Sequence, residues 1–232
     1  MQEILLEDVP PMQNTKAGVI IGRMQPPTIG HYKLINELSD AIRKHNHKTS
    51  EQHLESYPVV VLVTGKKSGE DKSKNPLSFE DRVKIIRASG KVDSKTVFIE
   101  ASNAFEALSK VREAGYEPTL IMVGSDRGGK DMPYKRMLDD YFNKDDGTKL
   151  KHHFIEVQRN DAKEMGEQAM LHLIDEIEES GIAKDDEVSG TLARKAAELD
   201  KLTAFSAITG LLRKPQIAKI VLKKVMKGAK NG

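Results

Sequence analysis

Residues 19–31 form the sequence Val-Ile-Ile-Gly-Arg-Met-Gln-Pro-Pro-Thr-Ile-Gly-His, which has the pattern of a strand, a tight turn and the start of a helix. The apolar β-branched run ends at Gly22, and two prolines follow. Beyond Gly30, apolar residues recur at helical spacing, at Tyr32, Ile35, Leu38, Ala41 and Ile42. A helix that starts where a strand ends presents free N–H groups and the positive end of its dipole. The stretch therefore predicts an anion-binding turn with a histidine beside it.

Similar strand-like runs alternate with helical patterns along the rest of the chain. The expected strands are 17–22, 59–64, 96–99, 119–124 and 153–157. The expected helices are 30–44, 78–89, 104–113 and 133–142, followed by 162–179, 189–198 and a helical segment after Leu202. Alternating β and α elements predict a Rossmann-like, doubly wound parallel sheet of five strands with helices on both faces. Two polar stretches, 45–56 and 65–75, have no apolar periodicity and are predicted as loops.

Composition limits the classes of protein that fit. The chain has 232 residues and no cysteine, which excludes disulfides and thiolate zinc sites. Its formal net charge of +2 is too small to indicate nucleic-acid binding by the protein as a whole. The N-terminus has the wrong charge for a signal peptide, and no apolar run is long enough to span a membrane. We expect the protein to be cytoplasmic and to form a homo-oligomer. We also expect one α/β domain over residues 1–210 and a basic helix or tail over 211–232.

A second candidate anion site lies at Val188-Ser189-Gly190-Thr191-Leu192-Ala193-Arg194. Ser189 is a suitable N-cap for the helix formers that follow. The first turn of that helix would present N–H groups, two hydroxyls and an arginine side chain, which together suit a phosphate.

A third stretch, Ile121-Met122-Val123-Gly124-Ser125-Asp126-Arg127, is a buried strand followed by charged residues at its carboxyl end, where ligands bind in open α/β sheets. Upstream, Ser78 with Asp81 has the pattern of a helix start. For Arg82 in that helix, two interpretations stay open: an ion pair with Asp81 or a nearby acid, or a contact with a ligand.

Thr28-Ile29-Gly30-His31 resembles the T/HxGH signature of the nucleotidylyltransferase superfamily. Val188-Ser189-Gly190-Thr191-Leu192-Ala193-Arg194 resembles the ISSTxxR motif of the same superfamily, and the two motifs stand in the expected order. The Gly22–Pro26 stretch before the first motif looks most like the nicotinamide-mononucleotide adenylyltransferase branch. The Gly124–Arg127 stretch is similar to phage-encoded cytidylyltransferase-like proteins, and Asn75–Arg82 also resembles a segment of these relatives.

The resemblance implies transfer of a nucleoside monophosphate from a nucleoside triphosphate to a phosphate-bearing acceptor, with release of pyrophosphate. ATP and nicotinamide mononucleotide are the favoured pair, and Mg²⁺ is expected to arrive with the triphosphate. The implied catalytic residues are His31, Thr28 and Arg194. Here His31 and the Thr28 hydroxyl would donate to phosphate oxygens. The implied nucleotide-binding residues are Gly22, Arg23, Met24, Gly30, Gly124, Asp126, Arg127, Ser189, Gly190 and Thr191, and no protein metal ligand is implied.

Other functions stay open at this point. A cytidylyltransferase that uses CTP and a sugar or polyol phosphate would carry the same motifs. A non-catalytic nucleotide-binding or structural protein would keep the fold without turnover. Residues 211–232 hold seven lysines and arginines and no acid, beside an apolar stripe. This segment either binds a nucleic acid or another anionic surface, or packs its apolar side on the domain and leaves the lysines in solvent.

Overall fold

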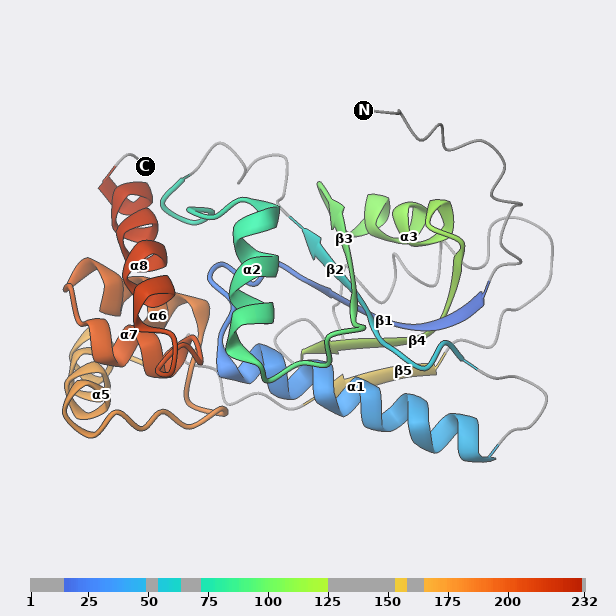
Figure 1. Cartoon of the computed structure of the whole chain (residues 1–232), viewed down its shortest axis with the longest axis horizontal. Helices are drawn as coiled ribbons and strands as arrows, with labels where there is room; N and C mark the ends of the chain where they lie inside the picture. Colours follow the sequence, from blue (N-terminus) through green and yellow to red (C-terminus); the bar gives the residue numbers. More distant parts are fainter. Residues whose placement is uncertain (1–14, 49–53, 64–71, 125–152, 158–164, 231–232) are drawn as a thin grey trace, which may run out of the picture.

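The computed structural model describes residues 15–48, 54–63, 72–124, 153–157 and 165–230. Its five parallel strands are β1 (Thr15–Gly22), β2 (Val59–Val63), β3 (Val97–Ala101), β4 (Tyr116–Gly124) and β5 (His153–Val157), which pair in the order β3-β2-β1-β4-β5 (Figure 1). The predicted α/β class with a parallel sheet is confirmed. Because the chain leaves β1 toward β2 on one side and later returns to β4 on the other, the strand order reverses at β1.

Alternate residues of the strands face two different layers. The odd-numbered residues of β1 and β2, such as Val19 and Val61, pack against Leu108 and Val111 of α3 (Ala104–Glu113). The even-numbered residues, such as Ile20, pack against α1 (Ile29–Lys48) and α2 (Phe79–Ser89). In Figure 1, α1 runs below the sheet and α3 above it. Strands covered on both faces explain why their sequences are almost continuously apolar.

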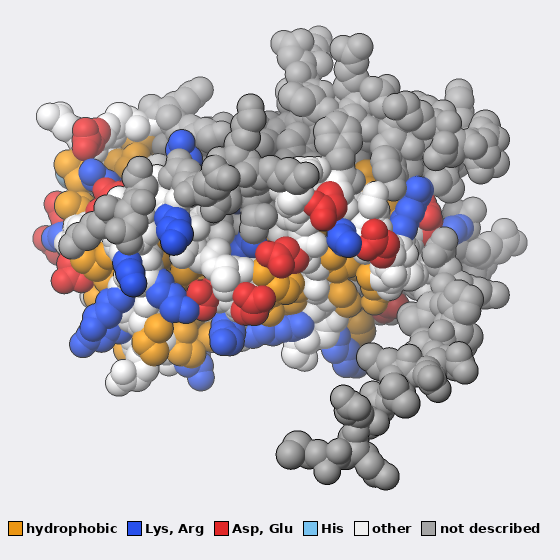
Figure 2. All heavy atoms as spheres, turned by 90° about the horizontal axis from the view of Figure 1, so that it is seen from above, with side chains coloured by type: hydrophobic (Ala, Val, Ile, Leu, Met, Phe, Trp, Pro, Cys, Tyr) orange, Lys and Arg blue, Asp and Glu red, His pale blue; other side chains and the backbone are white. Residues whose placement is uncertain are grey.

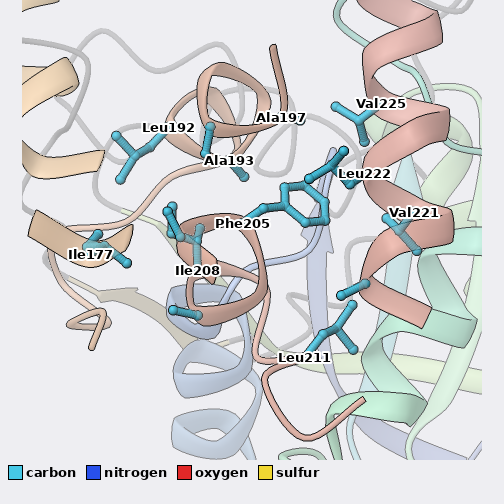
Figure 3. Close-up of a cluster of buried hydrophobic side chains, with 14 of the residues drawn as sticks. Ile177, Leu192, Ala193, Ala197, Phe205, Ile208, Leu211, Val221, Leu222 and Val225 are labelled. Carbon is cyan, nitrogen blue, oxygen red and sulfur yellow. The ribbon is translucent and has the colours of Figure 1, made fainter. Parts of the chain in front are cut away.

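The C-terminal helices form a second apolar cluster beside this sheet. They are α5 (Glu167–Ser180), α6 (Gly190–Glu198), α7 (Leu202–Ile208) and α8 (Pro215–Lys230). Phe205 of α7 lies at the centre of the cluster, between α6 and Leu222 of α8 (Figure 3). The boundary expected between residues 210 and 211 falls inside this cluster, because buried Leu211 and Val225 belong to it together with Ile208. The apolar side of α8 therefore packs on the other helices.

Contacts from α2 and α1 help to join the helical cluster to the sheet domain. Leu77, just before α2, and Ile85, within α2, belong to the same apolar cluster as α6 to α8. The hydroxyl of buried Tyr32 in α1 donates a 2.9 Å hydrogen bond to the carbonyl oxygen of Thr209, and burial raises the pKa of this phenol. The first and last thirds of the chain are thus packed together.

Several predicted boundaries were wrong. The stretch 45–48 is helical, because α1 continues to Lys48, and Asn46 then anchors the returning chain by bonding both the N–H (2.7 Å) and the carbonyl (2.9 Å) of Leu54. Strand β4 begins at Tyr116 although Pro118 lies within it. The register against β1 shifts directly after Pro118, between the pairs Ala17–Pro118 and Gly18–Leu120, so the proline lies at an irregularity of the sheet, where proline is tolerated.

Other predicted elements lie wholly or partly outside the described residues. The helix expected at 133–142 and most of the loop at 65–75 lie outside them. The helix expected from residue 162 is described from Glu167, with Gly166 at its N-cap. Among the helices that the structure describes, none combines the length and the apolar character that a bilayer crossing needs.

Candidate functional site

The first predicted motif lies where the strand order reverses. Strand β1 ends at Gly22, and α1 begins at Ile29 after a turn in which Met24 has a positive φ of 46°. Parallel α/β sheets bind ligands at this point, beyond the carboxyl ends of the strands. The first described turn of α1 contains no acidic residue, so the positive end of its dipole is not neutralised there. Met24 itself is 2% exposed, so its side chain belongs to the core and only its main chain is available for binding.

Thr28 orients His31. The main-chain N–H of Thr28 donates to His31 Nδ1 at 3.0 Å, and the Thr28 hydroxyl lies 2.8 Å from the same nitrogen. A main-chain N–H can only donate, so Nδ1 must be the acceptor, and we infer that the proton of the neutral ring is on Nε2. Thr28 is 1% exposed. Its hydroxyl thus serves the imidazole, which differs from the predicted bond between that hydroxyl and a phosphate.

The second motif begins α6 as the sequence predicts. Ser189 is the N-cap, and its hydroxyl accepts a 3.1 Å hydrogen bond from the N–H of Leu192. Gly190 and Thr191 follow at the open N-terminus, with no acid in the described first turn. One turn along, Arg194 Nη2 donates to the Thr191 hydroxyl at 3.1 Å, and Arg194 Nη1 donates to the carbonyl oxygen of Gln25. The arginine of the second motif therefore contacts the turn of the first motif.

Gly30 and Gly190, one from each motif, let the two segments of the chain approach each other closely. A Cβ atom at Gly190 would lie 2.9 Å from the carbonyl oxygen of Gln25, and one at Gly30 would lie 2.6 Å from the carbonyl oxygen of Asp185. The space beside Gly30 is thus filled by the chain just before α6. The resemblance implies that Gly30 binds the nucleotide; in the structure this glycine admits another segment of the protein. The two helix N-termini are held together by reciprocal packing.

The close approach at Gly190 gives a testable prediction. Gly190→Ala would place a methyl group against the Gln25 carbonyl, and we expect the free energy of unfolding to fall by about 1–3 kcal/mol. Urea denaturation followed by circular dichroism measures it. The matched control is Gly166→Ala, because no atom of the described residues lies within 4 Å of the added Cβ there. Equal losses in the two variants would contradict the packing role of Gly190.

Gln25 and Arg82 fix the turn from its other side. The side chain of Gln25 is 3% exposed and bonds Leu77 twice, donating to its carbonyl at 2.7 Å and accepting from its N–H at 3.1 Å. Arg82 Nη1 donates to the carbonyl oxygens of Arg23 (2.8 Å) and Val63 (3.2 Å), at the ends of β1 and β2. Neither interpretation of Arg82 from the sequence anticipated these main-chain contacts. The bonds between Gln25 and Leu77 could not be predicted from the sequence. A side-chain amide that bonds only main-chain groups needs no particular residue type as its partner.

Arg82 is a buried cation beneath the site. Its side chain has no exposed surface, and burial lowers the pKa of its guanidinium to about 10, so it remains charged at neutral pH. Within the described residues, Nη2 has no hydrogen-bond partner. The positive charge of Arg82 and the two helix N-termini make the carboxyl edge of β1 favourable for an anion.

Some of the predicted binding residues cannot be placed. Asp126 and Arg127 lie outside the described residues. Gly124 ends β4, the strand next to β1, where it pairs with Val157. Among the described residues, no group of three or more histidine or acidic side chains could hold a metal ion.

Comparisons with known proteins support the fold only. No family model matches the chain, and neither does any curated protein. The chain is similar to the crystal structure of a macrolide-efflux protein from Streptococcus pneumoniae, with a TM-score of 0.50 and 15% identity. The match covers 84% of this chain and 55% of that protein, so the chain spans little more than half its length. This likeness agrees with a Rossmann-like α/β fold and carries nothing about function.

Proposed function

We propose that the chain is a nucleotidylyltransferase that moves a nucleoside monophosphate from a nucleoside triphosphate to a phosphate-bearing acceptor, with ATP and nicotinamide mononucleotide as the favoured pair. The observation that carries the proposal is the contact between the two motifs. Arg194 and Gly190 of α6 touch Gln25, in the turn that leads to His31 of α1. Residues 169 positions apart are joined at the point where this fold binds nucleotides.

The proposed chemistry needs no general base. A phosphate acceptor is already an anion at neutral pH, so one of its oxygens attacks the α-phosphorus of the triphosphate directly. The bond to the β-phosphate oxygen breaks, and pyrophosphate leaves. Rate enhancement then comes from holding two polyanions in line and from stabilising negative charge at the α-phosphate.

The described side chains fit these tasks. His31, with Nδ1 occupied by Thr28, has Nε2–H as its donor to an α-phosphate oxygen. The N-terminus of α6, the Thr191 hydroxyl and Arg194 would hold the β- and γ-phosphates and the departing pyrophosphate. Arg23 is partly exposed at the end of β1 and would add a further cation. Mg²⁺ would enter bound to the triphosphate.

The test is pyrophosphate release with each of ATP, CTP, GTP and UTP in the presence of Mg²⁺. The acceptors would be nicotinamide mononucleotide, phosphopantetheine, glycerol 3-phosphate and sugar phosphates. CTP is included because Gly124–Arg127 resembles cytidylyltransferase-like proteins. A signal with one pair would establish the reaction and identify both substrates. Triphosphate binding without turnover on any acceptor would favour a non-catalytic nucleotide-binding protein.

A further inference from the structure

The exposed side of α8 is a strip of positive charge. Lys219, Lys223 and Lys227 follow one another at intervals of four residues, which places them on one helix face about 6 Å apart along the axis. Arg213 and Lys214 precede the helix, and all five side chains are exposed. Figure 2 shows lysine and arginine side chains gathered at the end of the molecule that holds the C-terminal helices. We call these five residues the α8 basic strip.

The described part of the chain does not neutralise the charges of the strip with ion pairs. Among the described residues, none of the five forms an ion pair, whereas the neighbouring Lys224 pairs with Asp81 at 2.6 Å. Residues 211–232 hold seven cations and no acid, and without them the net charge of +2 becomes −5. Surfaces that serve solubility alone intersperse both signs. The segregation of charge therefore points to an anionic partner.

The packing of α8 decides between two kinds of anionic partner. A helix that inserts into a membrane surface needs its apolar face free. In α8 that face is already buried, because Ala218, Val221, Leu222 and Val225 pack against α6, α7 and α2. The exposed residues are the lysines at regular spacing, together with Pro215, Gln216 and Ile220. Such a rigid row of charges suits a linear polyanion better than a bilayer.

We propose that the α8 basic strip binds the phosphate backbone of a nucleic acid without reading its sequence. The phosphates of one strand of a duplex are spaced about 3.4 Å apart along the axis of the duplex. Lysines about 6 Å apart along α8 would therefore meet roughly every second phosphate. Binding of this kind releases counterions, so its strength falls steeply with salt. With about four phosphates contacted, affinity falls about 10²-fold between 50 and 200 mM salt.

The experiment measures fluorescence anisotropy of a labelled DNA duplex and a labelled RNA of unrelated sequence. The variant is Lys219→Glu with Lys223→Glu, and we expect at least a tenfold loss of affinity at low salt and a salt slope smaller by about 2. The matched control is Lys44→Glu with Lys48→Glu, because these are also exposed lysines four residues apart on a helix. The control should bind as the unchanged protein does.

Three results would overturn the proposal. One is no binding of either probe at low salt. Another is an equal loss in the α8 variant and the α1 control, which would reflect net charge alone. The last is binding to vesicles that contain phosphatidylserine without binding to either nucleic acid. Anisotropy requires no turnover, so failure of the proposed reaction would leave this result interpretable.

Discussion

Replacing His31 with alanine is expected to lower the rate of pyrophosphate release by about 10²–10³-fold, the usual cost of removing one donor to a developing oxyanion. The imidazole accepts from Thr28 through Nδ1, which orients the ring and leaves its proton on Nε2 as the proposed donor to the phosphate. Because charge on the α-phosphate grows toward the transition state, the loss should fall on kcat more than on KM. Steady-state kinetics with the active substrate pair measure both.

The fold of the His31→Ala variant should persist. The histidine is only partly buried, and its removal costs the contacts of Nδ1 with the N–H and the hydroxyl of Thr28, about 1–3 kcal/mol of the free energy of unfolding. The matched control is His47→Ala, since His47 is an exposed histidine in the last turn of the same helix. It should keep full activity. Turnover near the wild-type rate in the His31 variant would remove His31 from the catalytic role.

The local features of this chain could be predicted because each depends on neighbours in sequence. Ser78 and Ser189 cap their helices through N–H groups three residues later. The strand that ends at Gly22 is apolar and β-branched, and the helix after the turn follows its apolar spacing. Such signals need no knowledge of the tertiary fold.

The features that build the site depend on contacts distant in sequence, and these could not be predicted. Nothing near Gly30 indicates that the carbonyl of Asp185 will lie against it. Arg82 has acids beside it in sequence, yet its guanidinium turns inward to two strand-end carbonyls. The extension of α1 to Lys48 also escaped prediction, because its stretch 45–48 contains no apolar residue to mark a buried face.

Arg194→Ala is expected to lower kcat/KM for pyrophosphate release by about 10²-fold, because the guanidinium would stabilise charge on the departing pyrophosphate. Its removal also takes a charged donor from the Gln25 carbonyl, which costs about 1.5–3 kcal/mol of the free energy of unfolding. Arg194→Lys should recover only part of the activity. A single ammonium cannot serve both the Gln25 carbonyl and a phosphate, as a planar fork of donors can.

Arg87→Ala is the control that separates the structural role of Arg194 from its proposed role in catalysis. Arg87 also donates to main-chain carbonyls, those of Asp93, Ser94 and Thr96, but it does so at the turn after α2, outside both motifs. Its loss should lower the free energy of unfolding and leave turnover unchanged. If Arg194→Ala were destabilised to the same degree and equally active, Arg194 would be a structural clamp between the two motifs. A loss of kcat/KM in Arg194→Ala at a temperature where both variants are folded would instead assign its guanidinium to the phosphates.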